Sequence, residues 1–363
     1  MHKDWDICAM NEYLRAGIVG AGIGRLHVAA LQSLPDLFRV QAICDIDEGR
    51  ARAVAAEYDV PHRTTSLAEL CRREDIDVIH ICTPPYLHYE QALQALEAGK
   101  HVILEKPVAG SLRHVDELIQ AATKASTRLM PIFQYRFGHG AQKLKMLIDH
   151  GLVGRAYLTT VETSWRRKPE YYAVPWRGKW RTELGGPMVS MAIHAHDLIY
   201  YLLGPVRNVF AYSRTLVNPL ETEDCVSASV EMGDGSLCSL SVTTGSAREI
   251  SRHRFCFSNL TAESNTEPYA NTADPWVFVG DTPEIQESID SALNQFQPLP
   301  EGFAGQFYRF YHAIQTKTEL PVTLDDSRAA LELITALYDS SRNRQSVSLP
   351  ISNDHPYYSG WQP

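Results

Sequence analysis

The stretch that decides the fold of this chain is Ala16-Gly17-Ile18-Val19-Gly20-Ala21-Gly22-Ile23-Gly24-Arg25-Leu26-His27. Its first residues are apolar and predict a buried strand, and the glycines that follow predict a tight turn into a helix. Gly20 permits the turn, and Gly22 lets the backbone approach a pyrophosphate at the helix N-terminus. The spacing is G-x-G-x-G, one residue shorter than the usual G-x-G-x-x-G, so the motif alone leaves a plain tight turn as the alternative.

Short apolar runs rich in Val, Ile and Leu alternate with amphipathic segments over the first part of the chain. This rhythm predicts strands buried on both faces of a parallel sheet and joined by helices. It therefore predicts an α/β domain with a doubly wound parallel sheet, a Rossmann domain, over residues 1–137, with residues 1–13 as an N-terminal extension. The expected strands are Ala16–Val19, Val40–Cys44, Val78–Cys82, Val102–Leu104 and Leu129–Phe133, and the expected helices are Glu48–Tyr58, Ser66–Glu74, Tyr86–Ala98 and Ser111–Ser126.

The rhythm changes after about Phe137, where consecutive strands with short turns predict a mainly antiparallel sheet. We expect an α+β domain over residues 138–363 with a C-terminal tail at 344–363, and a mobile loop or lid in the polar segment Ser258–Pro275. The expected strands are Ala156–Trp165, Val206–Leu216, Cys225–Glu231 and Leu237–Thr243, and the expected helices are Ala141–Asp149, Val189–Leu203, Phe303–Gln315 and Ser327–Ser341. A Gly233-Asp234-Gly235 turn predicts a hairpin between the last two strands.

The composition excludes several classes of protein. A net charge of −9 over 363 residues argues against a nucleic-acid partner, which needs a basic face. No apolar run reaches the roughly 18 residues of a membrane span, and the charged start differs from a signal peptide, so we expect a cytoplasmic protein without a membrane partner. Seven scattered cysteines without a C-x-x-C motif argue against a disulfide scaffold or a thiolate zinc site.

Asp45 ends the second predicted strand, 23 residues beyond Gly22. An acid at this place binds the ribose hydroxyls of the adenosine and repels a 2′-phosphate, so it favours NAD over NADP. Arg25 and Arg50 could offset that repulsion, which leaves NADP as an alternative cofactor. Asp45 could instead be a helix N-cap.

Two later segments, Thr83-Pro84-Pro85-Tyr86-Leu87-His88 and Glu105-Lys106-Pro107, complete a recognisable pattern. With the glycine turn, they resemble the Gfo/Idh/MocA family of glucose–fructose oxidoreductase, inositol dehydrogenase and relatives. The resemblance covers nearly the whole chain. It implies an open C-terminal sheet, and a homodimer or homotetramer formed through that sheet. The cofactor-binding residues it implies are Gly20, Gly22, Ile23, Gly24, Asp45, Thr83, Pro84, His88, Glu105, Lys106 and Pro107.

The resemblance also implies the catalytic residues. Lys106 reaches the substrate hydroxyl and the nicotinamide, aimed by a cis bond before Pro107, and its charge assists deprotonation. The segment Gly185-Gly186-Pro187…His194-Ala195-His196-Asp197 resembles the family's helix whose histidine is the general base, here His194. Asp197, on the same helical face, is expected to orient that imidazole or to neighbour Lys106. Many members carry an aspartate four residues before the histidine, where this chain has Ser190, which puts the usual Lys–Asp–His set in doubt.

Other interpretations of the histidines remain open. His194 could be a satisfied core histidine. His194 and His196 lie about 200° apart on a helix, so they cannot converge on one ion, and we expect no metal. We expect His196 to be packed or solvated.

The segment Trp165–Trp180 is aromatic and basic, with five Lys or Arg among residues 166–179. Such loops occur in sugar- and inositol-type members, where rings stack on sugar C–H faces and arginine binds hydroxyls or a carboxylate. Tyr172, Trp176 and Arg177 are therefore candidate substrate residues, and an anionic substrate such as a sugar acid fits the charge. The aromatics could equally form core or a subunit interface. Arg136 is expected to touch substrate or to bridge the two domains.

These observations predict an oxidoreductase that transfers hydride between NAD(P) and a secondary alcohol of a sugar, sugar acid or cyclitol. Lys106 polarises the hydroxyl and His194 accepts its proton. Two alternatives stay open. One is a hydrolase or epimerase that keeps NAD tightly bound and uses it transiently. The other is a non-catalytic sensor that binds the cofactor.

Overall fold

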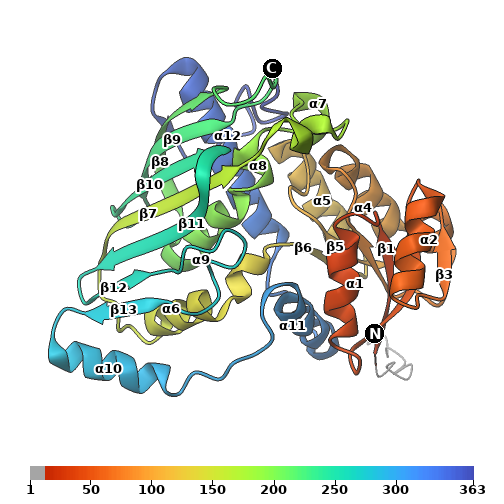
Figure 1. Cartoon of the computed structure of the whole chain (residues 1–363), viewed down its shortest axis with the longest axis horizontal. Coiled ribbons are helices and arrows are strands. Elements are labelled where there is room, and N and C mark those ends of the chain that lie inside the picture. The colour runs from red at the N-terminus through yellow and green to blue at the C-terminus, as the bar shows by residue number, and fades with distance from the viewer. Residues whose placement is uncertain (1–12) are drawn as a thin grey trace, which may run out of the picture.

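The computed structural model describes residues 13–363, and the predicted N-terminal extension falls almost wholly outside them. Two sheets lie in separate layers of the molecule, and helices pack between and around them (Figure 1). The first sheet belongs to the N-terminal part of the chain and the second to the C-terminal part.

The N-terminal sheet has six strands in the order β3-β2-β1-β4-β5-β6, all parallel. The central strands β4 and β5 are almost wholly buried because helices cover both faces of the sheet, as the Val- and Ile-rich runs predict, although β4 also buries His80. Its strands are β1 (Leu14–Val19), β2 (Phe38–Cys44), β3 (His62–Thr64), β4 (Val78–Ile81), β5 (His101–Leu104) and β6 (Leu129–Pro131). Its helices are α1 (Gly24–Gln32), α2 (Glu48–Glu57), α3 (Leu67–Arg72), η1 (Pro85–Leu87), α4 (His88–Glu97) and α5 (Leu112–Lys124). The predicted Rossmann fold is confirmed.

The C-terminal sheet has eight strands in the order β13-β12-β11-β7-β10-β9-β8-β14. Every neighbouring pair is antiparallel except β7 and β10, so the predicted mainly antiparallel sheet is confirmed. The hairpin predicted at Gly233-Asp234-Gly235 joins β9 to β10. The strands are β7 (Ala156–Arg166), β8 (Val206–Arg214), β9 (Cys225–Met232), β10 (Leu237–Thr243), β11 (Gly245–Phe257), β12 (Leu260–Glu263), β13 (Val277–Gly280) and β14 (Val347–Ser348).

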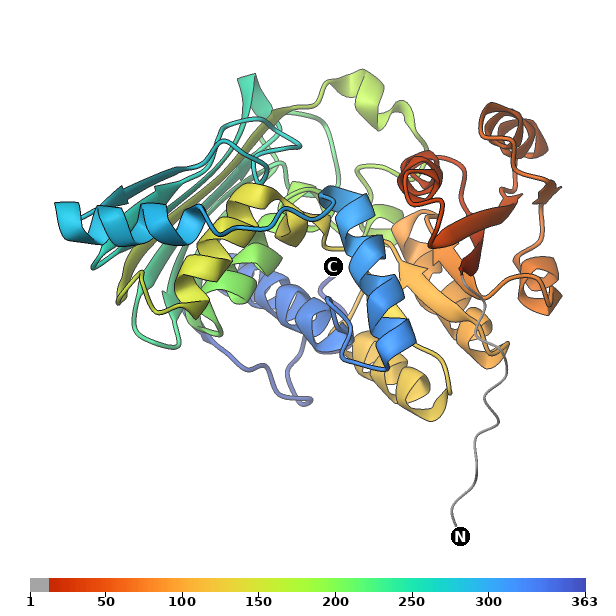
Figure 2. The ribbon, with the colours of Figure 1, turned by 90° about the horizontal axis from the view of Figure 1, so that it is seen from below.

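Helices of the C-terminal part cover one face of that sheet and reach back to the first domain (Figure 2). Helix α12 packs on β8, α9 and α5, and α11 packs on α1. Across the α12–α5 contact, Arg328 Nε donates to Asp116 Oδ1 at 2.7 Å. The helical elements are η2 (Gln134–Phe137), α6 (His139–Asp149), η3 (Pro169–Ala173), α7 (Trp180–Glu183), α8 (Pro187–Ser190), α9 (Ile193–Leu203), α10 (Pro283–Leu293), α11 (Gly302–Thr316) and α12 (Leu324–Asn343).

Two predicted elements differ from the structure. The expected helix Val189–Leu203 is two helices, α8 and α9, because the chain leaves helical geometry at Met191 (φ −123°, ψ −59°). The segment Ser258–Pro275 is not one loop, since β12 occupies its first part. The remainder is anchored to the core, where the Asn271 carbonyl accepts from the indole of Trp276.

The C-terminal tail crosses back over the first domain. The Trp361 side chain is fully buried, and its indole Nε1 donates to the Leu184 carbonyl at 2.7 Å. Gln362 Nε2 donates to the Gly110 carbonyl at 3.0 Å. The tail therefore ties the turn after α7 to the loop that precedes α5. Within residues 13–363, no helix is both long and apolar enough to cross a membrane.

Candidate active site

The glycine turn joins β1 to α1 and leaves a cradle at the carboxyl edge of the N-terminal sheet. Gly20 has φ +93°, and a Cβ there would lie 2.5 Å from the Cys82 carbonyl oxygen. A Cβ on Gly22 would meet nothing within 4 Å. Gly20 is therefore needed for folding, whereas the backbone at Gly22 faces open space in front of the N-terminus of a nine-residue helix. That space fits a bound pyrophosphate.

The two glycines predict opposite phenotypes for the same substitution. We expect Gly22→Ala to leave the free energy of unfolding within about 0.5 kcal/mol of the parent, because nothing contacts the added methyl group. The variant should weaken dinucleotide binding at least tenfold by occupying the cradle. Gly20→Ala should instead destabilise the fold by about 2 kcal/mol or more through strain and a backbone clash. Urea denaturation and calorimetric titration measure both quantities, and unimpaired binding by Gly22→Ala would contradict the cradle.

Asp45 lies at the end of β2 and only 6% of it is exposed. Its Oδ2 accepts from the Ala21 N–H in the glycine turn at 2.8 Å, and its Oδ1 accepts from the Asp47 N–H at 2.9 Å. The N-cap of α2 is Asp47, so the alternative of Asp45 as a helix cap is wrong. Exposed Ile23 and Ile46 flank this position and offer an apolar surface for a flat base. The residues present therefore fit the adenosine half of a dinucleotide.

Lys106 follows β5, and the expected cis bond to Pro107 is present. Its Nζ donates to the carbonyl oxygen of Ser190 at 2.7 Å. That carbonyl is available because α8 ends at Ser190, and the last carbonyls of a helix lack an intrahelical partner. Burial lowers the pKa of Lys106, and the carboxylates of Glu105 and Glu183 oppose that effect.

His194 sits in the first turn of α9, and 5% of it is exposed. Its ring stacks on Tyr135 with 4.8 Å between the centroids. Burial and the nearby Lys106 hold the pKa of His194 well below the usual value, so the imidazole carries no charge near neutral pH. Its buried Nδ1 has no hydrogen-bond partner among the described residues, which argues against a satisfied core histidine.

Asp197 does not orient His194, and this prediction is wrong. Its two carboxylate oxygens accept from Nε and Nη2 of Arg136 at 2.7 and 2.5 Å, in a bidentate ion pair. Arg136 is only 4% exposed, and its Nη2 also lies 3.0 Å from Asp326 Oδ1 at the start of α12. Arg136 therefore bridges η2, α9 and α12. This contact fits the predicted bridge between the two domains, and the contact of Arg136 with substrate stays a prediction.

Four of the residues predicted to bind the cofactor lie in the turns that follow β4 and β5, and they differ in exposure. Thr83 and Pro84 are partly exposed in the turn after β4. His88 is buried, with its two ring nitrogens each 2.7 Å from a carbonyl oxygen, of Thr83 and Pro107. It therefore ties the two turns together instead of contacting a cofactor. Pro107 is buried at the corner beside Lys106.

Glu105 also points inward, contrary to the expected contact with a cofactor. Its Oε1 accepts from His27 Nε2 at 3.1 Å, and its Oε2 accepts from the Lys106 N–H at 3.1 Å. Burial alone would raise the pKa of this carboxyl, but the hydrogen bond from His27 and nearby positive groups lower it to about 2. Glu105 is thus an ionised support beneath Lys106.

The aromatic and basic loop extends outward from Lys106. The Arg177 guanidinium lies 4.0 Å from the ring centroid of Tyr171 and 4.3 Å from that of Trp176. Tyr172 packs edge-on against Tyr171, at 5.0 Å between centroids. Trp176 and Tyr172 are partly exposed, so the structure places these three candidate substrate residues on one loop beside the lysine. An open hollow lies farther along the loop, lined by Arg166, Arg167, Lys168, Glu170, Tyr171 and Tyr269.

The comparisons with known proteins agree with this geometry. The family model "Oxidoreductase family, NAD-binding Rossmann fold" matches residues 14–133, and the model of the Gfo/Idh/MocA C-terminal domain matches residues 141–259. The chain belongs to the Gfo/Idh/MocA family. It is an NAD-binding oxidoreductase of that family.

Three relatives illustrate the breadth of the Gfo/Idh/MocA family. The uncharacterised oxidoreductase YrbE of Bacillus subtilis is 28% identical over 95% of this chain and 98% of its own length. Inositol 2-dehydrogenase of Rhizobium meliloti is 26% identical over 93% and 99%. The crystal structure of the WlbA dehydrogenase from Bordetella pertussis, in complex with NADH and UDP-GlcNAcA, has a TM-score of 0.82 and 28% identity, covering 94% of this chain and 100% of that one.

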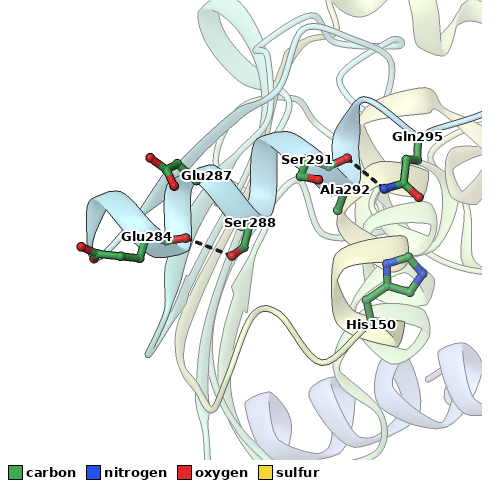
Figure 3. A pocket seen from close by; sticks show the side chains of 7 residues that line it. All are labelled: His150, Glu284, Glu287, Ser288, Ser291, Ala292 and Gln295. Atoms are coloured by element: carbon green, nitrogen blue, oxygen red, sulfur yellow. Dashed lines mark hydrogen bonds between the residues drawn. The ribbon is translucent and has the colours of Figure 1, made fainter.

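Other candidate sites fall outside this Gfo/Idh/MocA centre. Figure 3 shows a surface hollow between α10 and His150, where Glu284 and Glu287 extend away from the helix. This hollow lies across the molecule from β5 (Figure 1) and contains no Lys or Arg side chain, so we assign it no role. Among residues 13–363, no three His, Cys, Asp or Glu side chains are arranged to hold a metal ion. His196 is packed in the interior, and burial lowers its pKa to about 3.

Sequence reasoning missed three residues of this Gfo/Idh/MocA site. Tyr135 supports the His194 ring, and His27 holds Glu105. The third, Glu183, is a buried acid three residues before Gly186. The sequence offered a signal for His27, because it follows Gly24 by three residues and so lies on the buried face of α1. The roles of Tyr135 and Glu183 depend on contacts between distant segments and had no local signature.

Proposed function

We propose that this chain oxidises a secondary alcohol of a sugar, sugar acid or cyclitol with NAD. The observation that carries the proposal is the juxtaposition of Lys106 and His194. Lys106 follows β5 at the carboxyl edge of the N-terminal sheet, and His194 stacks on Tyr135, just beyond the carboxyl end of β6. Burial and Lys106 both lower the pKa of the His194 imidazole. A cation and a neutral base are the two groups that removal of a hydroxyl proton needs.

The chain's own residues divide the work as follows. Lys106 Nζ uses one N–H on the Ser190 carbonyl and has two left for the substrate hydroxyl oxygen, where its charge stabilises the developing alkoxide. The neutral imidazole of His194 accepts the hydroxyl proton at a ring nitrogen. Glu105, held by His27, supports the backbone of Lys106 from below. NAD, when bound, takes up the hydride from the carbinol carbon.

The substrate class is supported by the loop and by the relatives. Arg177, sandwiched between two aromatic rings, can donate paired hydrogen bonds to hydroxyls or a carboxylate. One relative is named inositol 2-dehydrogenase, and the WlbA structure holds a nucleotide sugar acid. The basic hollow at Arg166–Lys168 favours substrates that carry an anionic group.

The test is an assay of the full chain with NAD and with NADP against a panel of sugars, sugar acids, nucleotide sugar acids and inositols. We expect reduction of NAD at 340 nm with at least one member. Protein that purifies with nicotinamide attached and converts substrate without net absorbance change would instead support the hydrolase or epimerase alternative. Binding of NAD with no turnover of any member would support the sensor.

The preference for NAD gives a separate prediction at Asp45. We expect Asp45→Ala to raise the Kd for NAD about tenfold or more and to improve NADP binding, because the repulsion of a 2′-phosphate is lost. Asp47→Ser is the matched control, since serine keeps the helix cap and the charge beside the ribose stays on Asp45. Fluorescence titration with both dinucleotides measures the ratio, and an unchanged ratio in Asp45→Ala would contradict the assignment.

We also propose a homo-oligomer formed through the outer face of the C-terminal sheet, and we keep residue 137, the end of η2, as the domain boundary. The sheet face opposite α12 carries exposed Tyr157, Tyr212 and Leu237 on β7, β8 and β10. Exposed apolar side chains gathered on one sheet face are typical of subunit contacts. Light scattering coupled to size-exclusion chromatography should report a dimer or tetramer, and Tyr212→Asp with Leu237→Asp should shift it toward monomer.

A further inference from the structure

His27, on the buried face of α1, contacts the ends of two neighbouring strands at once. The residue is fully buried. Its Nε2 lies 3.1 Å from Oε1 of Glu105, directly after β5, and its Nδ1 lies 3.0 Å from Nδ1 of His80, in β4. The same Nδ1 lies 3.4 Å from Sγ of Cys82, which follows β4. His27 thus links the helix that follows the glycine turn to two paired strands of the sheet.

The carboxylate at one end of this cluster fixes the proton on the nearer ring nitrogen. Burial raises the pKa of the Glu105 carboxyl, but the hydrogen bond from His27 and the charge of Lys106 lower it to about 2. Glu105 is therefore ionised, and an ionised carboxylate can only accept hydrogen bonds. His27 must donate to it from Nε2.

His80 is the donor at the other ring nitrogen of His27. Burial and the neighbouring His27 hold the pKa of His80 well below its usual value, so His80 carries a single ring proton. On Nε2 that proton would have no acceptor among the described residues, and a buried donor without a partner is costly. On Nδ1 it points at His27. His27 is therefore a neutral ring that donates from Nε2 and accepts at Nδ1.

Aromatic rings of α11 hold the two imidazoles in this orientation. The ring centroid of Phe307 lies 5.2 Å from that of His27 and 5.0 Å from that of His80. Phe303 adds a second ring, 4.8 Å from His27. Helix α11 packs against α1, as Figure 1 shows. These rings enclose the imidazole of His27, so its two nitrogens stay directed at their partners.

The cluster also joins the two parts of the proposed site. The Cys82 carbonyl oxygen lies against the glycine turn, 2.5 Å from where a Cβ on Gly20 would stand. On the other side, Glu105 Oε2 accepts from the Lys106 N–H at 3.1 Å, and Lys106 leads into the cis corner at Pro107. The backbone of the lysine is therefore tied, through Glu105 and His27, to the helix that begins at the cradle.

We propose that His27 is a positioning residue that locks the helix of the glycine cradle to the strand end carrying Lys106, with Glu105 as the acceptor at one ring nitrogen and His80 as the donor at the other. The inference deepens the proposed function and rests on the role given there to Lys106. Such a lock matters because a shift of about 1 Å in a reacting group can cost roughly a hundredfold in rate.

Two substitutions of equal length test the link to the lysine without turnover. His27→Gln keeps an amide N–H near the place of Nε2, whereas His27→Met offers no donor. In ¹H–¹⁵N spectra of the lysine-labelled full chain, assigned with Lys106→Met, we expect the Lys106 amide signal to move in His27→Met and to stay close to the parent's in His27→Gln. Val28→Ala is the control, because it removes only apolar volume from a buried position of α1 and should leave that signal in place.

The proton positions have a direct readout of their own. Long-range ¹H–¹⁵N spectra of the histidine-labelled chain, assigned with His27→Gln and His80→Asn, should show His27 protonated at Nε2 alone and His80 at Nδ1 alone. A His27 ring protonated at both nitrogens would overturn the arrangement and the inference with it.

A double-mutant cycle with Lys106→Met is the kinetic test. We expect His27→Met to lower kcat about tenfold or more in the parent enzyme. In the Lys106→Met background the same change should cost no more than about twofold, because no lysine remains there to be positioned. His27→Gln should retain most of the parent's kcat. An equal loss in both backgrounds would show that His27 only supports the fold, and would overturn the inference.

The outcomes separate this inference from the proposed function. A Lys106 amide signal that moves in His27→Met, in a protein that turns over no sugar or cyclitol, would uphold the link while the proposed function fails. An unmoved signal in an active enzyme would overturn the link and leave the proposed function standing.

Discussion

Lys106→Met should lower the turnover number roughly a thousandfold while NAD still binds. The substitution removes the ammonium group that the cis-Pro107 corner and the Ser190 carbonyl hold in place. A charge positioned at a developing alkoxide accelerates the reaction by roughly a thousandfold. Methionine keeps the unbranched apolar stem, so the corner should fold unchanged.

Two measurements make this prediction decisive. Steady-state kinetics with the best substrate of the panel gives kcat, and calorimetric titration gives the affinity for NAD. Lys124→Met, on the last turn of α5, is the control and should behave like the parent. A Lys106→Met protein that binds NAD and retains full turnover would refute the role of the lysine.

Asp197→Ala should lower the free energy of unfolding by about 3 kcal/mol or more. The substitution leaves the buried Arg136 guanidinium with Asp326 as its one remaining carboxylate, and breaking a buried ion pair typically costs 3–5 kcal/mol. Because Arg136 joins η2 to α9 and α12, the substitution should destabilise the junction of the two domains. Urea denaturation followed by fluorescence measures the change.

The matched comparison for this ion pair is an exposed one. Arg52→Met removes the surface pair with Glu48 on α2 and should change stability by less than about 0.5 kcal/mol. Replacing both buried partners, as Arg136→Met with Asp197→Leu, should recover part of the loss, because no uncompensated charge remains. If Asp197→Ala lowered the free energy of unfolding as little as Arg52→Met does, the buried ion pair would not stabilise the junction.

Most elements of the N-terminal domain could be predicted from local sequence. The strand and helix alternation, the glycine turn and the position of Asp45 could all be predicted, because each depends on residues close together in the chain. The cis corner at Lys106 and the histidine of α9 followed from motifs of similarly short range. Strands β11 and β12 were missed because the buried positions of β11 include the polar Ser251 and His253, and β12 spans only four residues.

The partners of the site residues could not be predicted in the same way. A helical spacing of three residues placed Asp197 beside His194, but Arg136, distant in sequence, takes both of its carboxylate oxygens. The break between α8 and α9 leaves the Ser190 carbonyl free to accept from Lys106. No local sequence pattern predicted this break.

The sequence by itself therefore determined the kind of domain, the glycine turn that opens it, and the motifs that contain the lysine and the histidine proposed as catalytic. Only the tertiary structure decided which side chain each buried carboxylate contacts: Asp197 binds Arg136, Glu105 binds His27, and Glu183 lies against Arg177. The physical reason is that backbone geometry follows from neighbours in the chain. Pairing of buried charges depends instead on the distances that packing creates between segments far apart in it.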